Sequence, residues 1–231
     1  ANTLVSTAAL MKNLPFDPLR DFTYVSQIVL LPQILVVHPS LPAKSVKDLI
    51  ALAKARPGQV VYASGGIGAT SHIAAELFMR QAGVRMNHIP YKGNAPGLVD
   101  VLGGQVSLIF DTISTSIGYA KNGRLRALGV TSPQRTPLLP DVPTIAEAGL
   151  PGYEASVFNG VAAPARTPRE VIVRMHAEIA RVAQNPEVKK RFAEQGVELL
   201  ASRSPEEFTE YVKVELARAA KVVKEAGITA E

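Results

Sequence analysis

The stretch QVVYASGGIGATSHIAAELFMRQAGVRMNHI, residues 59–89, decides the fold. It opens with a short apolar run, Gln59 to Ala63, which predicts a buried strand, and continues through a glycine-rich turn. Thr70 to Gln81 carries apolar residues at helical spacing before Gly83, and Arg85 to Ile89 predicts a second strand. This order indicates a βαβ unit, whose parallel strands are covered by helices on both faces.

The same alternation extends in both directions from this unit. Upstream, Pro32 interrupts the apolar run Tyr24 to Val37, which predicts two strand pieces with a bend, and Ser45 starts a capped helix. Downstream we expect helices at 96–102 and 113–121 and strands at 106–110 and 125–131. The sequence therefore predicts an α/β fold.

The alternation breaks after residue 131. Five prolines between Pro133 and Pro151 predict an irregular connector, and Ser156 to Ala163 predicts one more strand that is followed by helices only. We expect three such helices: one with a Thr167 N-cap and Pro168 at its first position, one from Asn185 and Pro186 to Gly196, and one from Pro205 to Ala226 with a Ser204 cap.

This break suggests two lobes. Residues 36–154 would form the second lobe, and residues 1–35 and 155–231 would together form the first. A lobe built from both ends of the chain implies two crossings between lobes, and hence a hinge and a central cleft. No signal-peptide pattern opens the chain, so either the mature chain starts at Ala1 or something upstream is absent.

Composition argues against several classes of protein. The 25 basic and 20 acidic residues give a net charge of +5 without a dense basic run, and aromatics are only 6%, so nucleic-acid binding is weakly supported. The absence of cysteine excludes disulfides, thiolate metal sites and cysteine nucleophiles. No apolar run approaches the ~20 residues that span a bilayer. The four histidines lack metal-ligand spacing, so we expect no metal site.

Sequence motifs of common enzymes are missing as well. A dinucleotide fingerprint would need glycine at Ser71 and an acid about 20 residues later. A phosphate-binding P-loop would need a lysine followed by serine or threonine after the glycines. Neither a Gly-x-Ser-x-Gly elbow nor a pair of carboxylates stands out. We therefore expect no catalysis and no cofactor.

The turn from Ser64 to Thr70 is the best candidate for a ligand site. Gly66 and Gly68 let a ligand approach the backbone closely, and the first N–H groups of the following helix have no internal partner. The helix dipole and the hydroxyls of Ser64 and Thr70 would favour a carboxylate or a phosphate. The alternative is a tight turn without a ligand, since such turns need glycine in any case.

Further candidates lie at the ends of other strands, which meet at the ligand-binding edge of an open α/β sheet. Tyr91 and Lys92 follow one strand and Asp111 follows another. Lys92 could attract an anion or serve only solubility, and Asp111 would accept hydrogen bonds from backbone, water or a ligand hydroxyl. Phe158 and Asn159 could contact a ligand, although Phe158 suits a core equally well.

Eight segments are spread over nearly the whole chain: LPFDPLRDF (14–22), YASGGIG (62–68), PYKG (90–93), LGGQV (102–106), LRALGVT (125–131), LPDVPT (139–144), EAGLPGY (147–153) and APARTP (163–168). Together, in this order, they resemble the Bug (TctC-like) family of solute receptors. The resemblance implies a type II periplasmic-binding-protein fold with two α/β lobes that close on a small organic carboxylate. It also implies a periplasmic location and delivery to the membrane permease subunits of a tripartite tricarboxylate transporter.

The resemblance implies the site residues too. The 64–70 loop, Tyr91 and Asp111 would line the second-lobe side, while Phe158 and Asn159 would tune ligand choice. Ala69 stands where relatives often carry serine, which leaves backbone N–H groups and the hydroxyls of the loop to bind the carboxylate. Because the family normally begins with additional βαβ structure, roughly 60 to 80 residues are expected to precede Ala1 in a complete receptor.

Two other classes stay open at this point. An enzyme on a similar two-lobed scaffold would need an acid and a base paired in the cleft, which the sequence does not show. The effector domain of a regulator would carry a DNA-binding helix-turn-helix upstream instead of a signal peptide.

Overall fold

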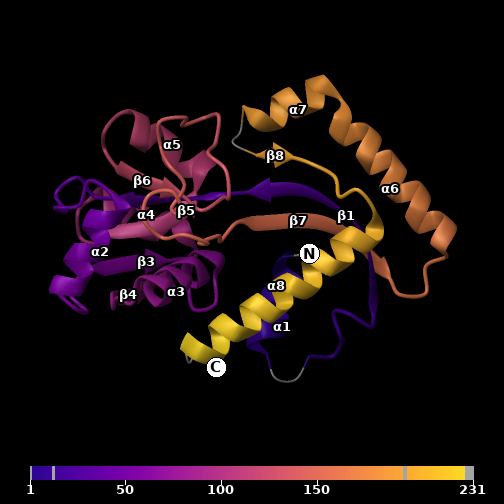
Figure 1. Ribbon diagram of the computed structural model, residues 1–231, viewed down its shortest axis with the longest axis horizontal. Coiled ribbons are helices and arrows are strands. Elements are labelled where there is room, and N and C mark those ends of the chain that lie inside the picture. The colour runs from indigo at the N-terminus through magenta and orange to yellow at the C-terminus, as the bar shows by residue number, and fades with distance from the viewer. Residues whose placement is uncertain (1, 12–13, 195–196, 227–231) are drawn as a thin grey trace. The chain divides into compact units, whose positions relative to one another are not determined.

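The computed structural model describes residues 2–11, 14–194 and 197–226 (Figure 1). The chain divides into two compact units: unit 1 consists of Ala1–Leu31 and Val157–Glu231, and unit 2 consists of Pro32–Ser156. Hinged closure of two lobes stays a prediction. None of the described helices combines the length and the apolar composition that crossing a membrane requires.

Unit 2 is built on a five-stranded mixed sheet with the strand order β4-β3-β5-β2-β6. The strands are β2 Gln33–Val37, β3 Val61–Ser64, β4 Asn87–Pro90, β5 Leu108–Thr112 and β6 Arg126–Val130. Parallel pairing of β3 with β4 and β5 confirms the predicted βαβ units. β2 runs antiparallel between β5 and β6, so the sheet is not purely parallel. This reversal brings Gln33, the first residue of β2, beside Thr112, the last residue of β5.

Helices cover both faces of this sheet. They are α2 Val46–Ala55, α3 Thr70–Ala82, α4 Asn94–Leu102 and α5 Ile113–Lys121. Along β2, Leu35 and Val37 belong to the core cluster shared with α2 and α3, while Ile34 and Val36 belong to the cluster shared with α4 and α5. Because side chains alternate along a strand, the apolar run Ile34 to Val37 of β2 is buried on both faces.

Local signals in the sequence mark several helix ends. Ser45 Oγ accepts a hydrogen bond from the Asp48 N–H at the start of α2, at 3.1 Å. Gly83 ends α3 in the left-handed conformation, with φ of 63°, which glycine adopts without steric cost. The start of α8 at a Ser204 cap and the bounds of α5 are likewise as predicted. Residues 132–156, all described, contain no helix or strand, as the prolines predicted.

Unit 1 has a three-stranded antiparallel sheet with the order β7-β1-β8. Its elements are α1 Asn2–Leu10, β1 Phe22–Leu31, β7 Val157–Pro164, α6 Arg169–Gln184, α7 Pro186–Ala193, β8 Glu198–Leu199 and α8 Pro205–Ala226. Figure 1 shows α8, in yellow, alongside α1. The core between the sheet and α8 is aromatic and includes Tyr24, Phe158 and Phe208.

Some expectations for unit 1 were wrong. Only helices were predicted after the strand at 156–163, but the structure has a further strand there, β8. β8 pairs with just two residues of β1, and so short a strand leaves no recognisable sequence pattern. Pro168, not Thr167, is the N-cap of α6, because the Pro168 carbonyl accepts the first hydrogen bonds of the helix, from the Val171 and Ile172 N–H groups. α1 occupies a stretch for which no element was predicted. The predicted helix end at Gly196 lies outside the described residues.

Candidate functional site

The glycine-rich loop joins the end of β3 to the start of α3. Ala69 is the N-cap of α3, with φ of −61° and ψ of 155°, and its side chain cannot accept a hydrogen bond from the first turn. Ser64 is buried at the end of β3, and Ile67 at the tip of the loop is exposed. The sequence thus places an uncapped helix N-terminus next to a loop of small residues.

The loop uses most of its own amide groups. Gly65 N–H donates to Ser71 Oγ at 3.0 Å, Gly66 N–H to Ser64 Oγ at 3.1 Å, and Gly68 N–H to His72 Nδ1 at 3.0 Å. The loop geometry is therefore held by side chains of the strand and helix that flank it. The N–H groups of Gly65, Gly66 and Gly68 are therefore used within unit 2.

The unused donors lie in the first turn of α3. Among the described residues, no acceptor lies within hydrogen-bonding geometry of the N–H groups of Thr70, Ser71 and His72, nor of the Ile67 N–H in the loop. Unpaired N–H groups at a helix start carry partial positive charge and bind anions. The anion-binding capacity thus lies in the helix start, two to four residues beyond Gly68, where the sequence predicted donors without an internal partner.

Two other helices begin at the same edge of the sheet. α4 and α5 follow β4 and β5, as α3 follows β3, and their N-caps Gly93 and Thr112 make no side-chain cap hydrogen bond. None of the three helices has an acidic residue in its first turn. In contrast, Ser45 and Asn185 cap α2 and α7 with their side chains. The three uncapped starts each place the partial positive charge of a helix dipole at this edge.

Asp111 holds these helix starts together. Its side chain is 1% exposed, and its carboxylate accepts hydrogen bonds from Asn94 Nδ2 at 2.9 Å, Ser116 Oγ at 2.6 Å and Thr115 Oγ1. Asn94 Oδ1 in turn accepts from Ser71 Oγ at 2.8 Å, the same hydroxyl that accepts from the Gly65 N–H. Asp111 therefore acts on the loop through other residues, and direct contact with a ligand stays a prediction.

Tyr91 is also tied back into unit 2. Its N–H donates to the Ser64 carbonyl at 3.0 Å, and its hydroxyl donates to Asp100 Oδ2 at 2.6 Å. The hydrogen bond to Asp100 raises the pKa of Tyr91 to about 12, so this phenol stays protonated. Lys92 is exposed beside it.

Two stacked histidine rings lie behind the loop. His72 and His88 have ring centroids 4.1 Å apart, and His88 Nε2 lies 2.6 Å from Ser64 Oγ. Burial, followed by the neighbouring His72, lowers the pKa of His88 to about 4, so this ring is neutral near pH 7. Burial acts to raise the pKa of Glu76, but hydrogen bonds from His72 and Tyr62 outweigh it and lower that pKa.

The cluster supports the loop rather than a metal. Within the described part of the chain, no group of three or more His, Asp or Glu side chains could hold a metal ion. The Ser64 hydroxyl, predicted to touch the ligand, is occupied by His88 and by the Gly66 backbone.

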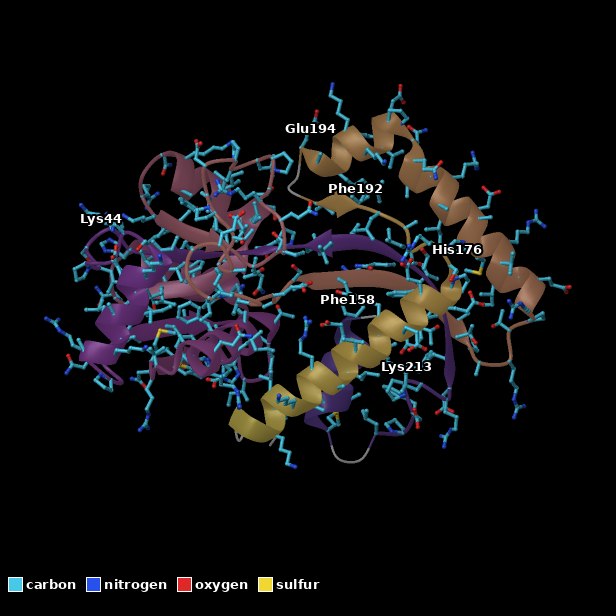
Figure 2. All side chains as sticks on the ribbon, in the orientation of Figure 1. Lys44, Phe158, His176, Phe192, Glu194 and Lys213 are labelled. Atoms are coloured by element: carbon cyan, nitrogen blue, oxygen red, sulfur yellow. The ribbon has the colours of Figure 1, made fainter. Side chains whose placement is uncertain are left out.

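Phe158 and Asn159 belong to unit 1. The Phe158 side chain, labelled in Figure 2, is 0% exposed. It makes edge-to-face contacts with Phe208 and Tyr211 on α8. It has the packing of a core residue, the alternative that the sequence left open. Asn159 is exposed on β7. A role of either residue in ligand choice stays a prediction.

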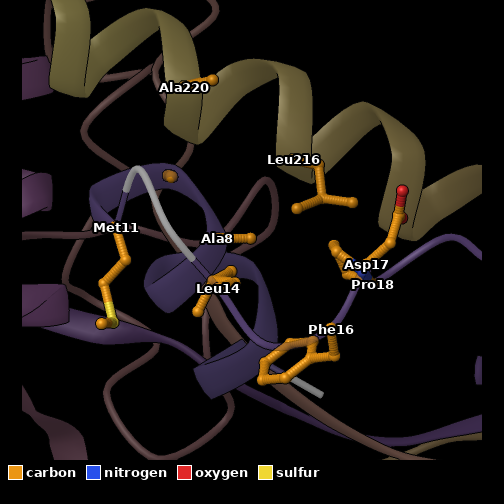
Figure 3. Close-up of a pocket in the computed structure, with 9 residues that line it drawn as sticks. Ala8, Met11, Leu14, Phe16, Asp17, Pro18, Leu216 and Ala220 are labelled. Atoms are coloured by element: carbon orange, nitrogen blue, oxygen red, sulfur yellow. The ribbon is translucent and has the colours of Figure 1, made fainter. Parts of the chain in front are cut away.

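Unit 1 also has a hollow of about 400 Å³ between α1, the 14–18 segment and α8 (Figure 3). Most of its lining is apolar: Ala8, Ala9, Met11, Leu14, Phe16, Pro18, Leu216 and Ala220. Its one acidic residue, Asp17, uses its carboxylate to accept from the Leu19 and Arg20 N–H groups. Among the described residues that line this hollow, none has a side chain that donates hydrogen bonds to an anion.

Sequence reasoning missed Gln33, Ser71 and Asn94. Ser71 and Asn94 lie in the first turns of helices, where small polar residues are common for other reasons. Gln33 opens an apolar strand, and only tertiary structure brings its amide to Thr70 Oγ1, at 3.1 Å. No pattern in the sequence joins these residues.

Known proteins resemble this chain over its whole length. The model of the tripartite tricarboxylate transporter family receptors matches residues 1–228. BugT of Bordetella pertussis is 36% identical over 219 residues, which are 95% of this chain and 67% of BugT. The chain spans about two thirds of the length of the curated relatives it matches.

Two solved proteins of Rhodopseudomonas palustris share the fold. One, solved with adipate, is 35% identical with a TM-score of 0.81, over 99% of this chain and 83% of the other. MatC, with bound malate, is 27% identical with a TM-score of 0.77, over 94% of this chain and 75% of MatC. These matches confirm the predicted fold class and the resemblance to the Bug (TctC-like) proteins. The chain belongs to the tripartite tricarboxylate transporter receptor family.

Proposed function

We propose that this chain is the ligand-binding part of a receptor that captures a small organic carboxylate for a tripartite tricarboxylate transporter. The receptor acts in the periplasm, passes its ligand to the membrane permease subunits and catalyses no reaction. Support comes from the family match and from two related proteins that hold the dicarboxylates adipate and malate.

The observation that carries the proposal is the uncapped start of α3. Its N–H groups from Thr70 to His72 have no acceptor among the described residues, and the loop before it is held rigid by Ser71 and His72. A hydrogen bond from such a donor to a carboxylate contributes on the order of 1.5 to 3 kcal/mol. Neutral donors also avoid the desolvation of a buried counter-charge.

A capping substitution tests this directly. Ala69 already has the extended backbone in which an N-cap side chain accepts from the first helical turn. We expect Ala69→Asp to cap α3 from within the chain and so to stabilise the ligand-free protein by about 0.5–2 kcal/mol. The same carboxylate occupies the donors and repels an anion, so the thermal shift caused by adipate or malate should disappear.

The matched control is Pro168→Asp, which adds one acid at the uncapped N-cap of α6 in unit 1. It changes the net charge equally and should leave the ligand-induced shifts unchanged. An Ala69→Asp protein that still responds to adipate or malate as the wild type does would move the carboxylate away from α3. Flat melting of the wild type across a panel of mono-, di- and tricarboxylates would contradict carboxylate capture itself.

A further inference from the structure

Gln33 carries an unpaired polar atom next to the start of α3. Its side chain is 3% exposed, and among the described residues its Oε1 has no hydrogen-bond partner. A buried acceptor without a partner costs about 1–3 kcal/mol, so such atoms are rare in folded proteins. An atom of this kind beside unpaired donors points to a ligand that supplies the missing hydrogen bond.

Hydrogen bonds hold both the backbone and the side-chain amide of Gln33 in place. The Gln33 N–H donates to Thr131 Oγ1, and the Gln33 carbonyl accepts from the Thr131 N–H, both at 2.8 Å. Its Nε2 donates to Thr70 Oγ1 at 3.1 Å, which anchors the amide to the first residue of α3. The free oxygen thus lies close to the N–H groups that would bind a carboxylate.

We propose that Gln33 is a specificity-determining residue that accepts a hydrogen bond from a hydroxyl on the carbon next to the bound carboxylate. This inference rests on the proposed function, because the carboxylate at α3 brings the neighbouring hydroxyl to the amide. The ligand class is therefore a 2-hydroxy acid. A glutamine oxygen can only accept, so it suits a hydroxyl or an amino group and not a second carboxylate.

The charges of the site favour the hydroxyl over an ammonium group. The three uncapped helix starts make this edge positive, which disfavours a cation. Both oxygens of the nearby Asp111 carboxylate already accept hydrogen bonds from Asn94, Thr115 and Ser116, so a direct ion pair with an ammonium group would have to displace one of them.

The test uses pairs of acids that differ by one hydroxyl: malate with succinate, lactate with propionate, and citrate with tricarballylate. Affinities are measured by calorimetry on the full chain. We expect the hydroxy acid of the pair that binds best to bind at least tenfold more tightly than its partner, since a site built for a hydroxyl rejects the analogue that lacks it. In Gln33→Met this ratio should fall to about one, because the thioether has a similar length but accepts hydrogen bonds only weakly.

Gln27→Met is the matched control. Gln27 is a buried glutamine at 8% exposure on β1 of unit 1, so the same substitution there should keep the wild-type ratio. Circular dichroism checks that both variants fold. A wild type without a preference within any pair, or a preference that survives in Gln33→Met, would overturn the role of Gln33 while leaving carboxylate capture intact. If none of the six acids bound while adipate did, the role of Gln33 alone would fall; if adipate and the wider panel of carboxylates failed as well, the proposed function would fall with it.

Discussion

Removing the Asp111 carboxylate should loosen the edge of unit 2 where three helices begin. In Asp111→Ala, the buried Ser116 hydroxyl loses its acceptor, and Asn94 Nδ2 keeps only a long hydrogen bond to the Phe110 carbonyl, at 3.5 Å. Thr115 is affected less, since its hydroxyl also donates to the Thr112 carbonyl at 2.8 Å. Asp111→Asn is the matched variant, because its amide oxygen can still accept from Asn94 and the hydroxyls can turn to accept from its NH₂ group.

The magnitude follows from these partners. A buried donor left without an acceptor costs about 1–3 kcal/mol. In Asp111→Ala the Ser116 hydroxyl is fully deprived, while Asn94 Nδ2 keeps only its long hydrogen bond to the Phe110 carbonyl. We therefore expect its free energy of unfolding to fall by about 3 kcal/mol, which corresponds to a melting temperature lower by roughly 6–12 °C. Asp111→Asn should lose only about 1 kcal/mol. Adipate or malate should also bind Asp111→Ala more weakly, since Asn94 no longer holds Ser71 and the loop.

Urea denaturation measures this effect. Far-UV circular dichroism reports on the whole chain, and tyrosine fluorescence on unit 2 in particular, because Tyr62, Tyr91, Tyr119 and Tyr153 lie in that unit. The chain has no tryptophan to mask this signal. A melting temperature of Asp111→Ala within 2 °C of the wild type would refute the idea that this carboxylate organises the helix starts. A melting temperature of Asp111→Asn below that of Asp111→Ala would refute it as well.

Two further predictions concern stability. A Cβ at Gly160 would lie 2.3 Å from Phe208 Cζ and 2.7 Å from the Ser26 carbonyl oxygen, so Gly160→Ala should lower the free energy of unfolding, measured by urea denaturation, by about 2–4 kcal/mol. Gly118→Ala, in an open helical position, should raise it by about 0.5–1 kcal/mol. Equal effects of the two substitutions would contradict the packing of β7. The pKa of His88 is about 4 in the folded chain and 6.5 in the unfolded chain, so the unfolded state binds more protons between these two pH values. The free energy of unfolding must therefore fall as the pH drops from 6.5 to 4. We expect a fall of about 1–2 kcal/mol, because solvent screens the charge of a half-buried ring. His88→Gln should lack this part of the pH dependence, and parallel pH profiles for the two proteins would argue against a buried neutral His88.

Local features of the sequence were enough to predict most elements. The apolar runs, the helical spacing after Thr70 and the serine caps act over a few residues, so the helices from Ile113 and from Pro205 begin and end where predicted. β2 shows the limit of such signals. Its apolar residues predict a buried strand but not its direction, because both faces are covered whichever way it runs.

The candidate site, too, could be predicted from local sequence signals only in part. The glycine-rich turn and the helix start after it could be predicted, because a strand, glycines and an uncapped helix are contiguous in the chain. The sequence alone could not show that Ser71 and His72 use the glycine N–H groups, or that Ser64 faces His88. Those contacts depend on the rotamers and packing of side chains.

By itself, then, the sequence determined the α/β order of elements, the glycine-rich turn and the family to which the chain belongs. Only tertiary structure decided that Gln33 reaches Thr70, 37 residues away, and that Asn94 reaches Asp111, 17 residues away. Short-range patterns arise from backbone geometry and burial that repeat every two or 3.6 residues. Hydrogen bonds between distant segments have no such period, because they depend on which strands become neighbours and in which direction each strand runs.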